Sequence, residues 1–201
     1  ILCFWKLLRM TDIFDFKFRH LKMKKKYTLE IIRLGLPSGI TQAIFSMAMV
    51  IVQSLTNSFG EMVIAANVII MRVDGFAMMP NFSFGTAMTT YAGQNVGAHR
   101  MDRVEQGARQ GTAIALGTSA VITLLILVFG KNLMAIFTDT SELVTLSANM
   151  MKILAVGYLA MAITQSLSGV MRGAGDTMTP MWISMITTVV ILAVTSNVVL
   201  S

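Results

Sequence analysis

The sequence contains few charged residues for its length. Of its 201 residues only 13% are charged, whereas 55% are hydrophobic, and the mean hydropathy is +0.70. A water-soluble domain usually carries about 25% charged residues. This composition excludes a globule whose surface faces water. It predicts an all-α integral membrane protein, because helices satisfy their own backbone hydrogen bonds within lipid.

Cysteine and recognisable catalytic motifs are also scarce. Cys3 is the only cysteine, so neither an internal disulfide nor a cysteine metal site can form. His20 and His99 lie in separate basic segments, which indicates solvated histidines rather than metal ligands. The GAGDT segment (173–177) lacks the Gly-Lys-Ser/Thr ending of a phosphate-binding loop. We therefore expect no enzyme activity, no cofactor and no metal.

Basic residues are concentrated near the start of the chain, and the net charge is +6. Because this basic run lies between apolar segments, it favours a loop beside anionic lipid over a nucleic-acid-binding arm. We predict that residues 1–8 end an upstream membrane-spanning helix. Residues 9–33 are predicted to form a basic amphipathic cytoplasmic loop, with a soluble helical linker as the alternative.

Residues 34–201 alternate between apolar segments and short polar connections. The apolar segments are long enough to cross a bilayer, and they cover about 34–58, 62–92, 110–130, 144–171 and 180–201. The loops rich in Lys and Arg alternate with loops that are not, so the basic loops all fall on one side. This pattern predicts a polytopic helical bundle in the cytoplasmic (inner) membrane. The last segment is still apolar at Ser201, so we expect the chain to be a piece of a longer protein.

The second of these segments carries Arg72 and Asp74 near its middle. An ionisable residue within a membrane span is costly and indicates a functional site. The two side chains point about 200° apart around the helix axis, so they cannot form a simple ion pair with each other. Surroundings of low dielectric favour the protonated form of a carboxylate. Asp74 is thus a candidate for exchange of a coupling ion, and a structural pair with a residue elsewhere in the protein is the alternative.

Polar residues recur on one face of several predicted spans. In a helix, positions about seven apart share a face. Two explanations fit: a wet cavity lined by these side chains, which we favour, or polar hydrogen bonds that hold the helices together. The candidate cavity-lining residues are Gln42, Ser46, Gln53, Asn57, Asn67, Asn81, Tyr158 and Gln165.

Pro80 lies inside the predicted span 62–92 and removes a backbone hydrogen bond from it. Gly75 and Gly85 flank this proline. Kinked spans often mark the moving element of a transporter. We therefore predict a hinge at these three residues, with a static kink as the alternative.

Several local motifs together resemble one known family. RLGLPSG (33–39), MRVDGFAMMP (71–80), GQNVGA (93–98) and MRGAGDTMTP (171–180) are similar to the carboxyl-terminal half of multidrug and toxic compound extrusion (MATE) transporters. This resemblance implies one lobe of a twelve-helix antiporter, in which a second, amino-terminal lobe is the partner. It also implies export of small cationic or amphipathic substrates, driven by entry of protons or sodium.

The sequence departs from this family in one respect. Some members bind the coupling cation through acidic residues in the helices that correspond to 34–58 and 144–171, but neither range contains Asp or Glu here. Coupling is therefore expected to use Asp74 or an acid in the amino-terminal lobe. Two alternatives to a drug exporter remain: a flippase for lipid-linked oligosaccharides or polysaccharides, and a membrane scaffold that transports nothing.

Overall fold

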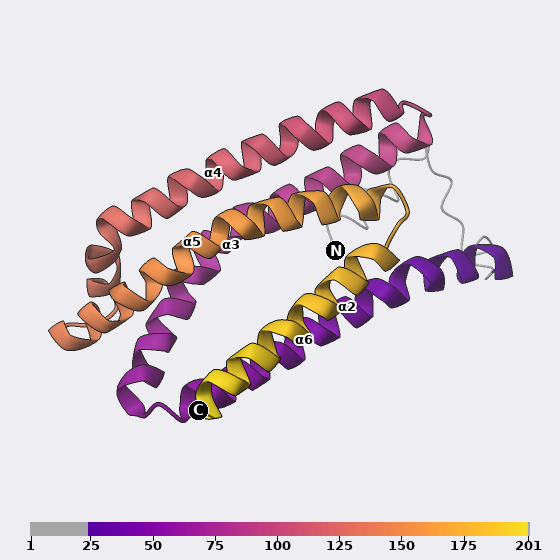
Figure 1. Ribbon diagram of the computed structural model, residues 1–201. Helices are drawn as coiled ribbons and strands as arrows, with labels where there is room; N and C mark the ends of the chain where they lie inside the picture. The colour runs from indigo at the N-terminus through magenta and orange to yellow at the C-terminus, as the bar shows by residue number, and fades with distance from the viewer. Residues whose placement is uncertain (1–23, 201) are drawn as a thin grey trace, which may run out of the picture. The chain divides into compact units, whose positions relative to one another are not determined.

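A computed structural model describes residues 24–200, with side chains as far as Ile191. The predicted upstream helix end (1–8), most of the predicted loop 9–33, Cys3 and His20 lie outside the described residues. All regular structure in the described part is α-helical (Figure 1). The helices are α2 (Lys25–Asn57), α3 (Glu61–Gly97), α4 (Met101–Ala135), α5 (Ser141–Gly173) and α6 (Met178–Leu200).

The first four of these helices are long and apolar enough to cross a membrane. Each predicted apolar segment falls on one helix, but the helices extend further into the polar flanks. One such extension is at α2, where residues 25–33 are helical, as the alternative of a helical linker expects. The reason is local: five of these nine residues are Lys, Leu, Glu or Arg, which all favour helix. No glycine or proline interrupts the stretch.

The described chain divides into two parts, at Leu36 and Pro37, and each is considered by itself. The described residues of the first part form the opening turns of α2, and their side chains are mostly exposed. The second part, from Pro37 onward, contains the rest of α2 and all other helices. Its core is a bundle of α3, α4 and α5.

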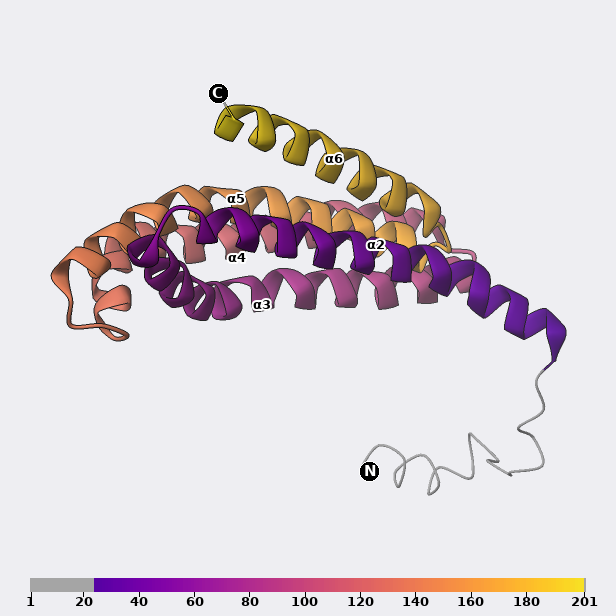
Figure 2. The ribbon, with the colours of Figure 1, turned by 90° about the horizontal axis from the view of Figure 1, so that it is seen from below.

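In this bundle α3 and α5 run parallel, and α4 runs antiparallel to both, so that the three helices lie side by side in both views (Figures 1 and 2). The bundle is packed differently at its two ends. One end contains the largest apolar cluster, in which bulky side chains from all three helices meet, among them Ile70, Ile126 and Met151. The amino-terminal half of α3 belongs to this end.

At the other end of the bundle, glycines lie where α3 packs against α5. A Cβ atom at Gly85 would lie 3.1 Å from the Gln165 carbonyl oxygen, and one at Gly93 would lie 3.3 Å from that of Gly173. A Cβ at Gly169 would collide with the backbone of Gly85. Small residues let helix backbones approach closely in a membrane. The backbones of α3 and α5 therefore make their closest contact here.

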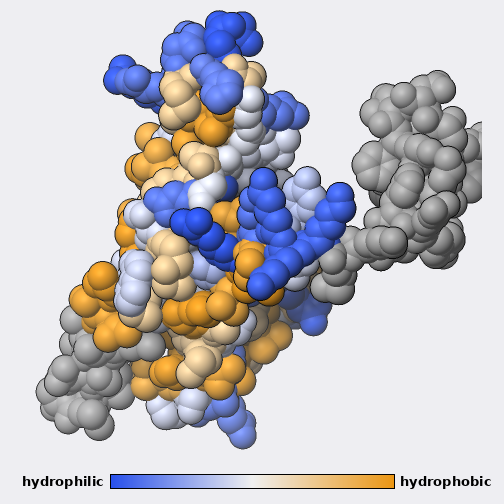
Figure 3. All heavy atoms as spheres, turned by 90° about the vertical axis from the view of Figure 1, so that its right-hand side faces the viewer, coloured by the Kyte–Doolittle hydropathy of each residue, from blue (hydrophilic) through white to orange (hydrophobic). Residues whose placement is uncertain are grey.

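The helices α3 and α5 end in the same kind of backbone turn. Residues His99 (φ 56°) and Gly175 (φ 88°) adopt left-handed conformations directly after the helices. At each end a backbone N–H bonds back across the turn, from Arg100 to Asn95 (2.8 Å) and from Asp176 to Met171 (2.9 Å). This is the Schellman arrangement, which satisfies carbonyl groups that a helix end leaves free. Hydrophilic side chains gather on the side where α3 ends (Figure 3).

Candidate functional site

Asp74 and Tyr158 meet between α3 and α5. The Tyr158 hydroxyl donates a hydrogen bond of 2.6 Å to Oδ1 of Asp74. Tyr158 is only 3% exposed, and Asp74 is half-buried. The partner of this carboxylate is thus a neutral hydroxyl on a neighbouring helix. A hydrogen bond to an ionised acceptor is short and stronger than one between neutral groups.

Asn81 connects the same region to α4. Its side-chain oxygen accepts a hydrogen bond of 2.7 Å from the Ser119 hydroxyl, and its Nδ2 donates one of 3.4 Å to the Tyr158 carbonyl oxygen. Asn81 is 1% exposed. In the described chain, therefore, hydrogen bonds of Asn81 and Tyr158 join helices. This favours the hydrogen-bonding alternative for these two residues, and a wet cavity remains a prediction.

Further hydrogen bonds join helices of the bundle, among them two between α4 and α5 that were not predicted. Thr123 of α4 donates to the Ala155 carbonyl oxygen of α5 (2.9 Å), and the hydroxyls of Thr112 and Ser166 lie 3.0 Å apart. The sequence did contain a signal for them. Thr112, Ser119 and Thr123 share one face of the otherwise aliphatic helix α4.

The remaining polar candidates are divided between α2, α3 and α5. Gln53 donates to Asn57 (3.0 Å) and accepts a longer hydrogen bond from Asn67 (3.4 Å), so these three residues form a small cluster beside the turn between α2 and α3. Gln42 and Ser46 are exposed on α2, whereas Gln165 is half-buried on α5. The structure thus gathers Asp74, Asn81 and Tyr158 in one place and Gln53, Asn57 and Asn67 in another.

The predicted hinge residues have different surroundings. Pro80 lies within α3, which continues without interruption but bends along its length (Figure 1). A Cβ at Gly75 would have nothing within 4 Å, whereas Gly85 lies in the close contact with α5. The glycine at 85 is thus used for packing, and bending at Pro80 and Gly75 remains a prediction.

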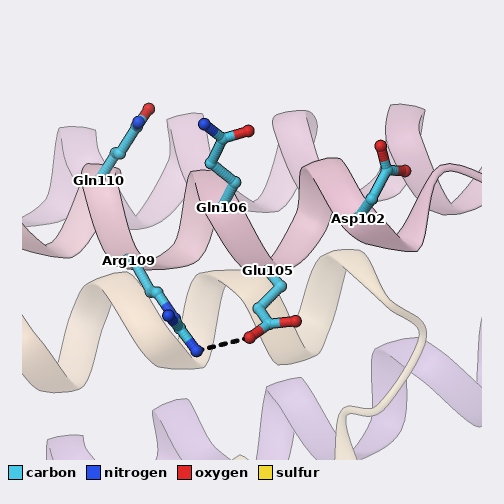
Figure 4. Close-up of a pocket in the computed structure, with 5 residues that line it drawn as sticks. All are labelled: Asp102, Glu105, Gln106, Arg109 and Gln110. Atoms are coloured by element: carbon cyan, nitrogen blue, oxygen red, sulfur yellow. Dashed lines mark hydrogen bonds and ion pairs between the residues drawn. The ribbon is translucent and has the colours of Figure 1, made fainter.

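A surface hollow of about 270 Å³ lies along the amino-terminal part of α4. Glu105 and Arg109 form an ion pair of 2.6 Å on one side of the helix. The side chains of Asp102, Gln106 and Gln110 point to the opposite side from this pair (Figure 4). The paired side chains are at least 68% exposed, so the pair contributes little free energy. Since all its lining residues belong to one helix, this hollow is a weaker candidate than the Asp74–Tyr158 pair.

Within residues 24–191 no group of three or more His, Cys, Asp or Glu side chains could hold a metal ion.

Comparisons with known proteins agree on one family. The MatE family profile matches residues 37–198. The chain is 30% identical over 166 residues to the probable multidrug resistance protein YoeA of Bacillus subtilis, covering 83% of this chain and 36% of that protein. It is 29% identical to the probable multidrug resistance protein NorM of Thermotoga maritima, covering 78% of this chain and 34% of that protein.

Solved structures show the same fold. A MATE transporter in the bent conformation matches with a TM-score of 0.79 at 19% identity, over 90% of this chain and 40% of that one. A MATE complex with MaL6 matches with a TM-score of 0.81 at 20% identity, over 92% of this chain and 42% of that one. The chain spans about a third of the length of the curated relatives it matches. It is an all-α integral membrane chain and belongs to the MatE family of multidrug and toxic compound extrusion transporters.

Proposed function

We propose that the complete protein exports small cationic or amphipathic molecules across the cytoplasmic membrane, coupled to the entry of protons or sodium ions. Membership of the MatE family is the observation that carries this proposal. The names of its curated relatives refer to multidrug resistance. Those names favour drug export over a flippase or a scaffold, and no feature of the described residues favours either of these.

Asp74 is the proposed coupling site in this part of the protein. It is the only carboxylate within the predicted membrane spans, and its partner Tyr158 belongs to a different helix. A proton or sodium ion that binds Asp74 competes with the Tyr158 hydroxyl for the negative charge. Binding therefore weakens a charge-assisted bond between α3 and α5.

Such a bond change drives transport only if it favours one conformation over another. Pro80 separates Asp74 from the glycine contact of α3 with α5. Beyond the proline, the close backbone approach at Gly85 and Gly93 resists movement. Residues 61–79 are thus the part of α3 whose packing against α5 depends most on the Asp74–Tyr158 bond.

The test uses full-length protein reconstituted into liposomes. Ethidium movement is followed after a pH gradient, a sodium gradient or neither is imposed. The proposal expects ethidium export that requires one of the two gradients, and that gradient identifies the ion. Correctly inserted protein that moves no ethidium under either gradient would contradict drug export.

A further inference from the structure

Arg72 occupies an unusual position for a cation. It lies about 16 Å along the axis of α3 from Glu61, which is close to the middle of a hydrocarbon layer about 30 Å thick. At this depth the side chain is too far from either helix end to reach the headgroups. An arginine in contact with lipid tails would be costly. The guanidinium therefore needs water or an anion beside it.

The described chain does not supply that anion. Arg72 is exposed on the surface of the bundle, whereas Asp74 turns inward to Tyr158. In residues 24–191 the ion pairs are those of Arg100 with Asp102 and Arg109 with Glu105, and Arg72 takes part in neither. An anion that pairs with Arg72 therefore comes from outside these residues.

In the described chain the surface beside Arg72 is apolar and exposed. Phe76 and Met79 follow at spacings of four and seven, so they share its helix face. They are 74% and 62% exposed. Between them and Arg72, Gly75 leaves the backbone uncovered, because nothing lies within 4 Å of the position of a Cβ there. A cation thus lies at one end of an exposed aromatic and thioether surface.

We propose that Arg72, Phe76 and Met79 form a binding site for an amphipathic organic carboxylate. The planar guanidinium matches a carboxylate with two parallel hydrogen bonds. Phe76 contacts the apolar body of the ligand, and the flexible Met79 side chain adapts to its shape. The site rests on the membrane-spanning course of α3 and goes beyond the proposed export of cations, because its ligand carries the opposite charge.

Phospholipid headgroups fit this site poorly, since their phosphates lie at the edge of the hydrocarbon layer and Arg72 lies near its middle. A carboxylate from the rest of the protein is the other possible partner. In that case the charge would be satisfied permanently and a soluble anion would not compete for it. The experiment separates these two cases.

The test measures binding of pyrenebutyrate to full-length protein in nanodiscs by equilibrium dialysis, with binding to empty nanodiscs subtracted. Pyrenebutyltrimethylammonium has the same apolar body with a cationic group and serves as the matched probe. We expect Arg72→Gln to weaken pyrenebutyrate binding at least tenfold and Arg72→Lys to weaken it less. Phe76→Ala is expected to weaken it as well. Arg103→Gln, which removes an exposed arginine outside the predicted spans, should leave it unchanged.

Equal binding of pyrenebutyrate by native protein and Arg72→Gln would overturn the proposal. So would a native protein that binds no more than empty nanodiscs. If Arg72→Gln lowers the unfolding temperature but leaves pyrenebutyrate binding unchanged, the partner of Arg72 is a carboxylate from the rest of the protein. The same preparation is assayed for ethidium export, so failure of this site is distinguished from failure of the proposed transport function.

Discussion

The Tyr158 hydroxyl donates a hydrogen bond of 2.6 Å to the Asp74 carboxylate and so joins α5 to α3. Tyr158→Phe removes this donor with little change in shape. We expect the variant to lose about 1–3 kcal/mol of stability, since a partly buried carboxylate loses its partner. Thermal unfolding in detergent measures this loss. An unchanged unfolding temperature would show that water replaces the hydroxyl without cost.

The second prediction concerns the glycine contact of α3 with α5. Gly169→Ala places a methyl group against the Gly85 backbone, so the helices must separate. Overpacking of this kind costs about 1–3 kcal/mol. Gly157→Ala on the same helix is the control, because nothing lies within 4 Å of a Cβ there. If both variants unfold at the same temperature, the close approach contributes nothing.

A third prediction tests the hydrogen bonds across the bundle. Ser119→Ala leaves the buried oxygen of Asn81 without its donor. Such bonds average about 0.6 kcal/mol in membranes, and an orphaned buried group costs more, up to about 3 kcal/mol. Thr118→Ala is the matched control, since that hydroxyl bonds to the Ile114 carbonyl of its own helix. We expect only Ser119→Ala to lower the unfolding temperature measurably.

The start of α6 should depend on pH. The helix begins at Met178, and Asp176 accepts the Thr179 backbone N–H at 3.0 Å. An acceptor that precedes the helix satisfies one of its free N–H groups, so the Asp176 side chain stabilises the start of α6. Hydrogen bonding from Thr179, through its side chain and backbone, holds the pKa of Asp176 below its ordinary value of 3.8.

A carboxyl group whose pKa is lower in the folded state stabilises the fold above its unfolded-state pKa. That stabilisation is lost as the pH falls through the folded value. We therefore expect amide exchange at the start of α6 to be slower in native protein than in Asp176→Ala at pH 7. The two should become alike well below pH 3.8, the ordinary value. A difference that persists at low pH would contradict a role for the ionised carboxylate.

Sequence reasoning located the helices better than it located their contacts. Hydropathy and motif resemblance were sufficient for the membrane class, the apolar segments and the family, because each depends on local pattern. For residues 25–33 the charge pattern left a loop and a helical linker open, and the structure shows a helix there. Asn81 and Tyr158 were expected around water because periodicity identifies a shared face, but it does not tell which helix packs against that face. Here Ser119 of α4 provides the partner.

The glycine contact was missed for a similar reason. Gly85 was interpreted as a point of flexibility, yet its close approach to α5 depends on Gly169, which lies far away in the sequence. The sequence did indicate Asp74 as a candidate residue, because a carboxylate within an apolar segment can be recognised from the sequence alone. Its pairing with Tyr158 required the register between two parallel helices.

The central claim is that Asp74 couples ion entry to export, and one comparison tests it most directly. Full-length native protein and Asp74→Asn are reconstituted at equal amounts, and ethidium export is measured under separate proton and sodium gradients. Asn keeps the size of the side chain but removes its ionisable charge. We predict that the native protein exports ethidium under one gradient and that Asp74→Asn, although folded, loses this gradient-driven export. Equal export by the two proteins would contradict the claim and leave Asp74 with a structural role.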